Sequence, residues 1–229
     1  SLSLTPYEAR YRIALLLNFQ TANPNAQNAL LKTLEEAPRS VILLLTADAP
    51  ENLLPTIASR CEILRLRPVA VEVLEEALRT RWQLEPERAR LLASLSNGRT
   101  GLALRMAADP SLLEKRSGQV EEFLRLLPLN RRERFAAAEA LAKNRDALRL
   151  TLGAWLSLAR DLLLCTSGAA EKLVNRDYER ELRRLADRLE REGALGMVTA
   201  ILNSLEMLEQ NANLRLLADN LLLEFPCLN

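Results

Sequence analysis

The sequence changes character at Pro68, and this change limits the possible fold more than any other feature. Before Pro68, short apolar runs alternate with helical segments, the pattern of parallel strands connected by helices. After it, we find no strand pattern, and apolar residues recur at three- and four-residue spacing, as in amphipathic helices. The sequence therefore predicts a small α/β region followed by an all-helical region.

Asn23 is a favourable N-cap and Pro24 a favourable first helical residue, so a helix is predicted from there to Glu36, ended by Pro38. A short helix is expected over residues 51–58. Only three strands are predicted, which is few for such a sheet, so we interpret the chain as a piece of a longer protein. The three predicted parallel strands are residues 11–18, residues 41–46 and Glu62–Leu66.

Beyond Pro68 the pattern predicts three short helices and then a longer helical region. Asp109-Pro110 forms the boundary between them. We therefore divide the chain into residues 1–67, 68–110 and 111–229. The short helices are expected at 71–81, 86–94 and 100–107, and the breaks in the longer region at 128–130, 165–168 and 191–193.

The composition excludes several classes of function. The net charge of the 229 residues is +1, so any basic patch for nucleic acid would have to be local. No apolar run reaches transmembrane length. The chain has no histidine, and its first glycine is Gly98, so His-based catalysis and a glycine-rich phosphate loop within residues 1–97 are both excluded. We expect no cofactor or metal, and the three widely spaced cysteines fit a reducing cytoplasm.

Arg60 is the most informative residue, because it ends a helix–strand–helix unit where the local pattern does not require arginine. By itself, Ser59-Arg60-Cys61 is typical of a solvated turn. Here it follows Leu54-Pro-Thr-Ile57, and a helix with the sequence Asn28-Ala-Leu-Leu-Lys-Thr-Leu-Glu-Glu36 lies further upstream. Together these segments resemble the AAA+ clamp-loader subunits of bacterial DNA polymerase III and their archaeal and eukaryotic relatives.

This resemblance implies that Arg60 is an arginine finger, which reaches the ATP site of a neighbouring subunit. A guanidinium fork stabilises the charge that develops during phosphoryl transfer, and a lysine would supply the charge without the fork. The resemblance assigns Ser59 and Cys61 to positioning the finger. No base lies near Cys61 in the sequence, so we do not expect it to be a nucleophile.

The ATP-site positions of this chain depart from the pattern of active clamp-loader subunits. Those subunits carry an Asp-Glu pair where this sequence has Leu17 and Asn18, and neither residue holds Mg²⁺ well. Gln20 does not replace the missing charge. Active members of the family also carry a sensor arginine at the position that Gly101 occupies in this chain. The resemblance therefore implies a degenerate ATP site, as in the delta-prime branch of the family.

The C-terminal segment Asn211-Ala-Asn213-Leu-Arg215-Leu-Leu-Ala218 is similar to the signature of the last delta-prime helix. The purely structural alternative is a polar helix start followed by an amphipathic core helix. The family implies an AAA+ base over 1–67, a helical lid over 68–110 and a helical collar over 111–229. Its partners would be an adjacent ATPase subunit, other collars, the sliding clamp and primer-template DNA, without membrane.

Two other interpretations of the function stay open. The chain is an active ATPase subunit of the gamma/tau kind if its phosphate loop lies upstream, or a helical scaffold if the base is a relic.

Trp155 is expected in the core or in inter-subunit packing. A basic cluster is interpreted as a solvated helix start in preference to a DNA contact; it consists of Arg125, Arg131, Arg132 and Arg134.

Overall fold

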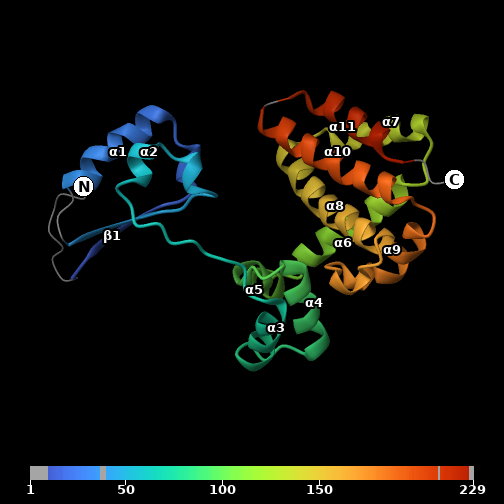
Figure 1. Cartoon of the computed structure of the whole chain (residues 1–229), viewed down its shortest axis with the longest axis horizontal. Helices are drawn as coiled ribbons and strands as arrows, with labels where there is room; N and C mark the ends of the chain where they lie inside the picture. The colour runs from blue at the N-terminus through green and yellow to red at the C-terminus, as the bar shows by residue number, and fades with distance from the viewer. Residues whose placement is uncertain (1–9, 37–39, 211, 227–229) are drawn as a thin grey trace. The chain divides into compact units, whose positions relative to one another are not determined.

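The computed structural model describes residues 10–36, 40–210 and 212–226 (Figure 1). The chain divides between Arg67 and Pro68 into two compact units, each treated below by itself.

The first unit contains a parallel pair of strands, β1 (Arg12–Leu16) and β2 (Val41–Leu45). They pair in register from Arg12 opposite Val41 to Leu16 opposite Leu45. This confirms two predicted strands and the helix between them, although Pro38, the predicted end of that helix, lies outside the described residues. The helical elements of this unit are η1 (Phe19–Thr21), α1 (Pro24–Glu36), η2 (Pro50–Asn52) and α2 (Pro55–Ala58).

The prediction of a third strand is wrong. Residues 62–66 form no strand, and within the described part of the chain the sheet has two strands. Leu64 is 76% exposed and Leu66 is 96% exposed. A β-strand persists only where its backbone N–H and C=O groups pair with a neighbouring strand. An apolar sequence without such a partner remains an extended connection.

One face of the two-stranded sheet is apolar and exposed. Ile13 and Leu15 on β1 lie opposite Ile42 and Leu44 on β2, and each of these four side chains is at least 37% exposed. Both α1 and α2 lie on one side of the sheet (Figure 1). Parallel sheets are usually covered on both faces, so this one is only half covered by the described residues.

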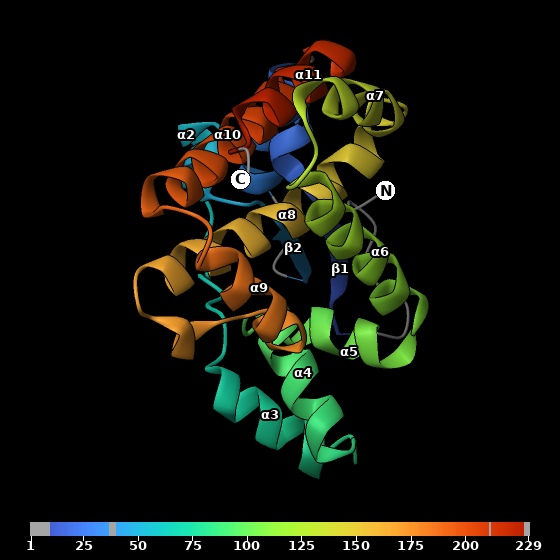
Figure 2. The same cartoon turned by 90° about the vertical axis from the view of Figure 1, so that its right-hand side faces the viewer.

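The second unit is entirely helical in its described residues, as the sequence predicted. In the longer region α8 (Arg145–Thr166) and α10 (Arg191–Glu209) run side by side (Figures 1 and 2). The helical elements are α3 (Val71–Thr80), α4 (Pro86–Ser96), α5 (Thr100–Ala108), α6 (Ser111–Leu126), α7 (Arg131–Leu141), α8 (Arg145–Thr166), η3 (Ala170–Lys172), η4 (Arg176–Tyr178), α9 (Glu179–Ala186), α10 (Arg191–Glu209) and α11 (Leu214–Glu224).

The three short helices and the breaks at 128–130 and 165–168 are confirmed. The break at 191–193 is wrong, because Arg191 already begins α10 and the break lies just before it. A further break before α8 was missed. There the side chain of Asn144 accepts a hydrogen bond from the backbone N–H of Ala147 and caps the new helix.

The helical unit has two apolar cores. The smaller core joins α3, α4 and α5 through residues such as Leu74 and Leu92. The larger core joins α6 to α11 around Trp155, which is completely buried and donates a hydrogen bond from Nε1 to the carbonyl of Gln119 at 2.9 Å. Trp155 is therefore a core residue, and its full burial excludes direct contact with another subunit.

Arg134 corrects the interpretation of the basic cluster. Arg125, Arg131 and Arg132 are exposed, but Arg134 is 1% exposed. Its guanidinium donates hydrogen bonds to the carbonyls of four residues near the C-terminal ends of α6 and α11, so it cannot belong to a solvated helix start. A buried cation is tolerated where acceptors surround it. These acceptors belong to Leu127, Leu222, Phe225 and Pro226.

Gly98 is required by the turn between α4 and α5. Its φ is +77°, and a Cβ there would lie 2.2 Å from the carbonyl oxygen of Val69. Its own carbonyl accepts a hydrogen bond from the Val69 N–H at 2.9 Å. Only glycine allows so close a backbone approach together with positive φ. The glycine therefore fixes the beginning of the helical unit against this turn.

Candidate functional site

Arg60 lies just after α2, at the surface of the first unit. Its side chain is 39% exposed and pairs with Glu35 in the last turn of α1, which is 52% exposed. Arg60 Nε donates to Glu35 Oε1 at 2.7 Å, and Nη2 lies 2.6 Å from the same oxygen. Nη1 donates to the backbone carbonyl of Thr56 at 3.0 Å. The guanidinium is thus held in one orientation while part of it faces solvent.

The neighbours of Arg60 form the turn that presents it. The Ser59 hydroxyl donates to the Thr56 carbonyl at 3.3 Å, and the Cys61 N–H donates to the Ala58 carbonyl at 3.3 Å. Burial raises the pKa of the Cys61 thiol, so the unreactive protonated form dominates at neutral pH. This chemistry does not suit a nucleophile.

Gln27 fixes the position of α2 on α1 at the opposite end from Arg60. Its side chain is 5% exposed. Nε2 donates to the Ala22 carbonyl at 3.1 Å, and Oε1 accepts from the Leu54 N–H at 3.0 Å. Leu54 directly precedes α2, so this amide replaces a missing backbone partner at the start of that helix. Ile57 inside α2 is completely buried.

The carboxyl ends of the parallel strands β1 and β2 lie at one edge of the sheet, and Leu17 and Asn18 directly follow β1 there. Leu17 is 67% exposed. Asn18 has φ 50° and ψ 47°, a left-handed conformation that asparagine tolerates, and its N–H donates to Thr46 Oγ1 at 2.9 Å. Gln20 donates to Asp48 Oδ2 at 3.0 Å. Asn18 therefore builds a turn here and supplies no negative charge.

Gly101 lies in the first turn of α5, in the unit that does not contain Arg60. A Cβ at this position would have no atom within 4 Å, and its φ is not in the left-handed region. The backbone therefore does not require glycine, and the space around it accepts a side chain. The fold therefore does not exclude a longer side chain, such as arginine, at this position.

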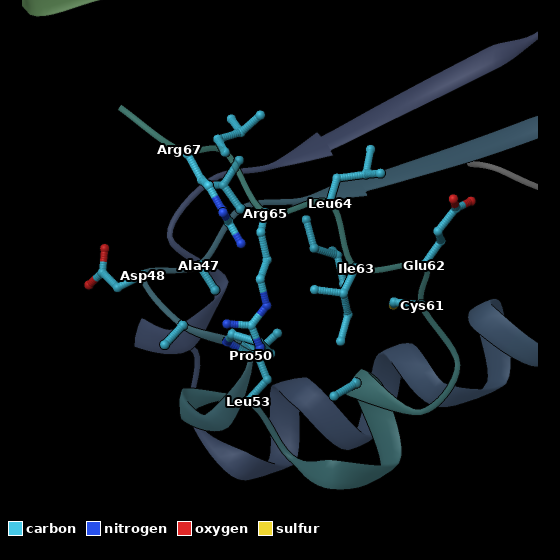
Figure 3. A pocket seen from close by; sticks show the side chains of 15 residues that line it. Ala47, Asp48, Pro50, Leu53, Cys61, Glu62, Ile63, Leu64, Arg65 and Arg67 are labelled. Carbon is cyan, nitrogen blue, oxygen red and sulfur yellow. The ribbon is translucent and has the colours of Figure 1, made fainter. Parts of the chain in front are cut away.

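A pocket of about 510 Å³ lies in the first unit, between the end of β2 and the extended residues 61–67 (Figure 3). Arg60 does not line it. Its walls include Leu53, Ile63 and Leu64, and the Arg65 side chain extends between them. Arg65 Nη2 lies 3.6 Å from Glu51 Oε1. The pocket lies where residues 62–66 leave the edge of β2 unpaired.

Among the described residues, no group of three His, Cys, Asp or Glu side chains could hold a metal ion. Within the same ranges, no helix is long and apolar enough to cross a membrane.

The C-terminal motif has a structural explanation in its described part; Asn211 lies outside the described residues. Asn213 caps α11, because its Oδ1 accepts hydrogen bonds from the N–H groups of Arg215 and Leu216. Arg215 donates to Asp219 Oδ2 and to the Phe135 carbonyl, both at 3.0 Å. The motif therefore starts α11 and attaches it to α7.

Sequence reasoning missed Glu35 and Gln27. Both lie on α1, in or beside the motif that carried the resemblance, but the pattern gave no contact partner for either. A glutamine next to helix-forming residues is compatible with an exposed position, so the sequence did not predict that Gln27 is buried. The Leu34-Glu35-Glu36 segment was a sequence signal, and the structure gives one of its two carboxylates a partner in Arg60.

Two protein families match the chain. Residues 1–70 match the family described as DNA polymerase III, delta subunit. Residues 110–226, just over half of the chain, match the family described as DNA polymerase III, delta subunit, C terminal.

Individual relatives agree with these matches. DNA polymerase III subunit delta' of Bacillus subtilis is 25% identical over 225 residues, which are 96% of this chain and 68% of that protein. The protein of the same name from Pseudomonas aeruginosa is 34% identical over 142 residues, 62% of this chain and 42% of that protein. DNA polymerase III subunit tau of Escherichia coli is 37% identical over 73 residues, 32% of this chain and 11% of that protein. The chain thus spans about two thirds or less of these relatives.

Proposed function

The chain belongs to the DNA polymerase III delta family of clamp-loader subunits and is of the delta-prime type, and we propose that it supplies Arg60 in trans to the ATP site of a neighbouring subunit. It does not hydrolyse ATP itself. In this role it couples hydrolysis by the neighbour to loading of the sliding clamp on primed DNA.

The presentation of Arg60 carries this proposal. Its guanidinium is partly exposed, lies beyond the end of α2 and is oriented by Glu35 and Thr56. A guanidinium held in this way is suited to stabilising phosphoryl-transfer charge that arises on another molecule. Leu17 and Asn18 support the second half of the proposal, because neither can supply the carboxylate that Mg²⁺ prefers.

The domain roles are part of the same proposal. We assign residues 1–67 to the base, 68–110 to the lid and 111–229 to a collar that contacts the other subunits. The separate cores of α3–α5 and α6–α11 support a distinction between lid and collar. The partners proposed are the ATP-binding neighbour, the sliding clamp and primer-template DNA.

The test is the ATPase rate of a clamp loader reconstituted with Arg60→Ala or Arg60→Lys, with clamp and primed DNA present. We expect a large loss for alanine, since arginine fingers account for roughly 10³–10⁵ in rate in the GTPase cases. Lysine restores little, because it lacks the planar fork. Assembly measured by gel filtration serves as the control. An unchanged ATPase rate for Arg60→Ala refutes the finger and favours the scaffold alternative.

The gamma/tau alternative has one supporting observation, the 37% identity to tau over 73 residues. It predicts that the full-length protein binds ATP tightly and hydrolyses it without a partner. Equilibrium binding of ATP and a single-subunit ATPase assay distinguish the two. Tight binding with hydrolysis would replace the proposal made here.

A further inference from the structure

The contact between Arg60 and Glu35 connects two segments that are 25 residues apart in sequence. We infer that Glu35 is a positioning residue for Arg60, which orients the guanidinium for an acceptor outside the subunit. This inference rests on the proposed function of Arg60 and goes beyond it, because it assigns a role to a second residue on a different helix.

The frame around Arg60 supports a positioning role. Gln27 binds the Leu54 N–H just before α2, and Glu35 binds the Arg60 side chain just after it. Ile57, between these two points, is completely buried. The short helix α2 is therefore attached to α1 before its first residue and after its last. With Glu35 removed, the frame remains, but the arginine side chain keeps only its contact to the Thr56 carbonyl and gains rotational freedom.

The guanidinium retains binding capacity while Glu35 holds it. It carries five N–H groups, and the contacts of Nε and Nη2 to Glu35 and of Nη1 to Thr56 engage at most three of them. N–H groups therefore remain for phosphate oxygens. The ion pair is partly exposed, so water and salt weaken it, and Glu35 does not compete strongly with a multiply charged phosphate group for the remaining N–H groups.

In the opposite role, Glu35 would keep the Arg60 guanidinium from the phosphate, and its removal would raise the ATPase rate. A withheld finger needs a pair that competes strongly with the phosphate, and such pairs are buried and hydrogen-bonded through both oxygens. Here one carboxylate oxygen makes the contact, and both side chains are partly exposed. The geometry therefore favours orientation over inhibition.

The experiment compares Glu35→Ala, Glu35→Gln and Glu36→Ala in the reconstituted loader, each with Arg60 and with Arg60→Ala. Glu36 is the matched control, since it removes the same charge one residue further along α1. We expect Glu35→Ala to lower the ATPase rate roughly 3- to 10-fold, the effect of releasing one immobilised side chain. Glu35→Gln keeps an acceptor oxygen and recovers most of the rate.

The loss must depend on Arg60. In the Arg60→Ala background, Glu35→Ala should cause no further decrease, whereas a merely structural effect would add to it. An unchanged rate for Glu35→Ala, in a loader that Arg60→Ala disables, overturns the inference and leaves the proposed function intact. A rate that increases also overturns it, because Glu35 would then withhold the finger.

A second measurement keeps the two proposals apart. The Arg60 Nε–H resonance of the full chain, observed by NMR, should exchange with water faster in Glu35→Ala than in Glu36→Ala. If Arg60→Ala leaves the ATPase rate unchanged, the proposed function fails, and so does the positioning role for hydrolysis. Equal exchange rates in the two variants would overturn the orienting contact itself.

Discussion

The two units bury their side chains very differently. In the described part of the first unit, only Ile57 and Gln27 are buried. The helical unit contains two continuous cores, one of them formed around Trp155 by six helices. Burial of apolar surface is the main source of stability. The proposed chemistry therefore lies on the thinly packed unit, and the helical unit supplies most of the stability.

Arg134→Met should give the largest effect on this comparison, by weakening the more stable unit. It leaves the carbonyls of Leu127, Leu222 and Phe225 without their donor, and each buried unsatisfied acceptor costs about 1–3 kcal/mol. We expect a loss of about 3 kcal/mol or more in the free energy of unfolding, measured with urea. Arg132→Met, on the exposed side of the same helix, should change it by less than about 0.5 kcal/mol. Equal losses would contradict this role of Arg134.

Ile57→Ala should have a smaller effect and act on the first unit alone. We expect a cost of about 2 kcal/mol, the lower end for such truncations, because a thin unit can collapse around the cavity. Hydrogen exchange of backbone amides is the measurement. Amides of β1 and α1 should lose protection while those of α8 and α10 keep theirs. Loss of protection in both units would show that they unfold together.

The smallest expected effect concerns the two cysteines of the described chain, one in each unit. Burial raises the pKa of both the Cys61 and the Cys165 thiol, and at Cys165 the neighbouring Arg183 opposes the shift. The folded state thus keeps its thiol protons to higher pH than the unfolded state does. Stability from these groups is complete below the ordinary thiol pKa and falls as the pH rises through the raised one.

Alkylation with iodoacetamide at several pH values, followed by peptide mapping, tests the protonation of the two thiols. Both rates should rise with pH. Cys61 should react faster than Cys165, since the first unit opens more readily. A faster reaction at Cys165 would reverse the stability order of the two units.

The sequence predicted those parts of the fold that depend on local pattern. Two strands, α1 and the short helices after Pro68 follow from short apolar runs, helical spacing and Asn-Pro or Asn-Gly signals. The strand at 62–66 was wrong because apolar composition does not specify a pairing partner. The break before α8 was missed because a single capping asparagine in a helical region is a weak signal.

The candidate site was predictable in its residue types and not in its contacts. Arg60 was identified from its motif, but nothing in the spacing connected it to Glu35 on another helix. Arg134 was misjudged for a related reason. An arginine among other arginines has the pattern of a solvated surface, and three of the four carbonyls that bind Arg134 come from the return of the chain at residues 222–226.

The sheet face that the described residues leave exposed is a candidate surface for self-association in concentrated solution. Ile13, Leu15, Ile42 and Leu44 form two in-register rows of aliphatic side chains that water wets poorly. Such a surface attracts hydrophobic dyes and other molecules with the same face, and it becomes more adhesive on warming, when salt is high or when protein is crowded. Polar substitutions in those two rows are therefore expected to reduce this self-association without touching Arg60.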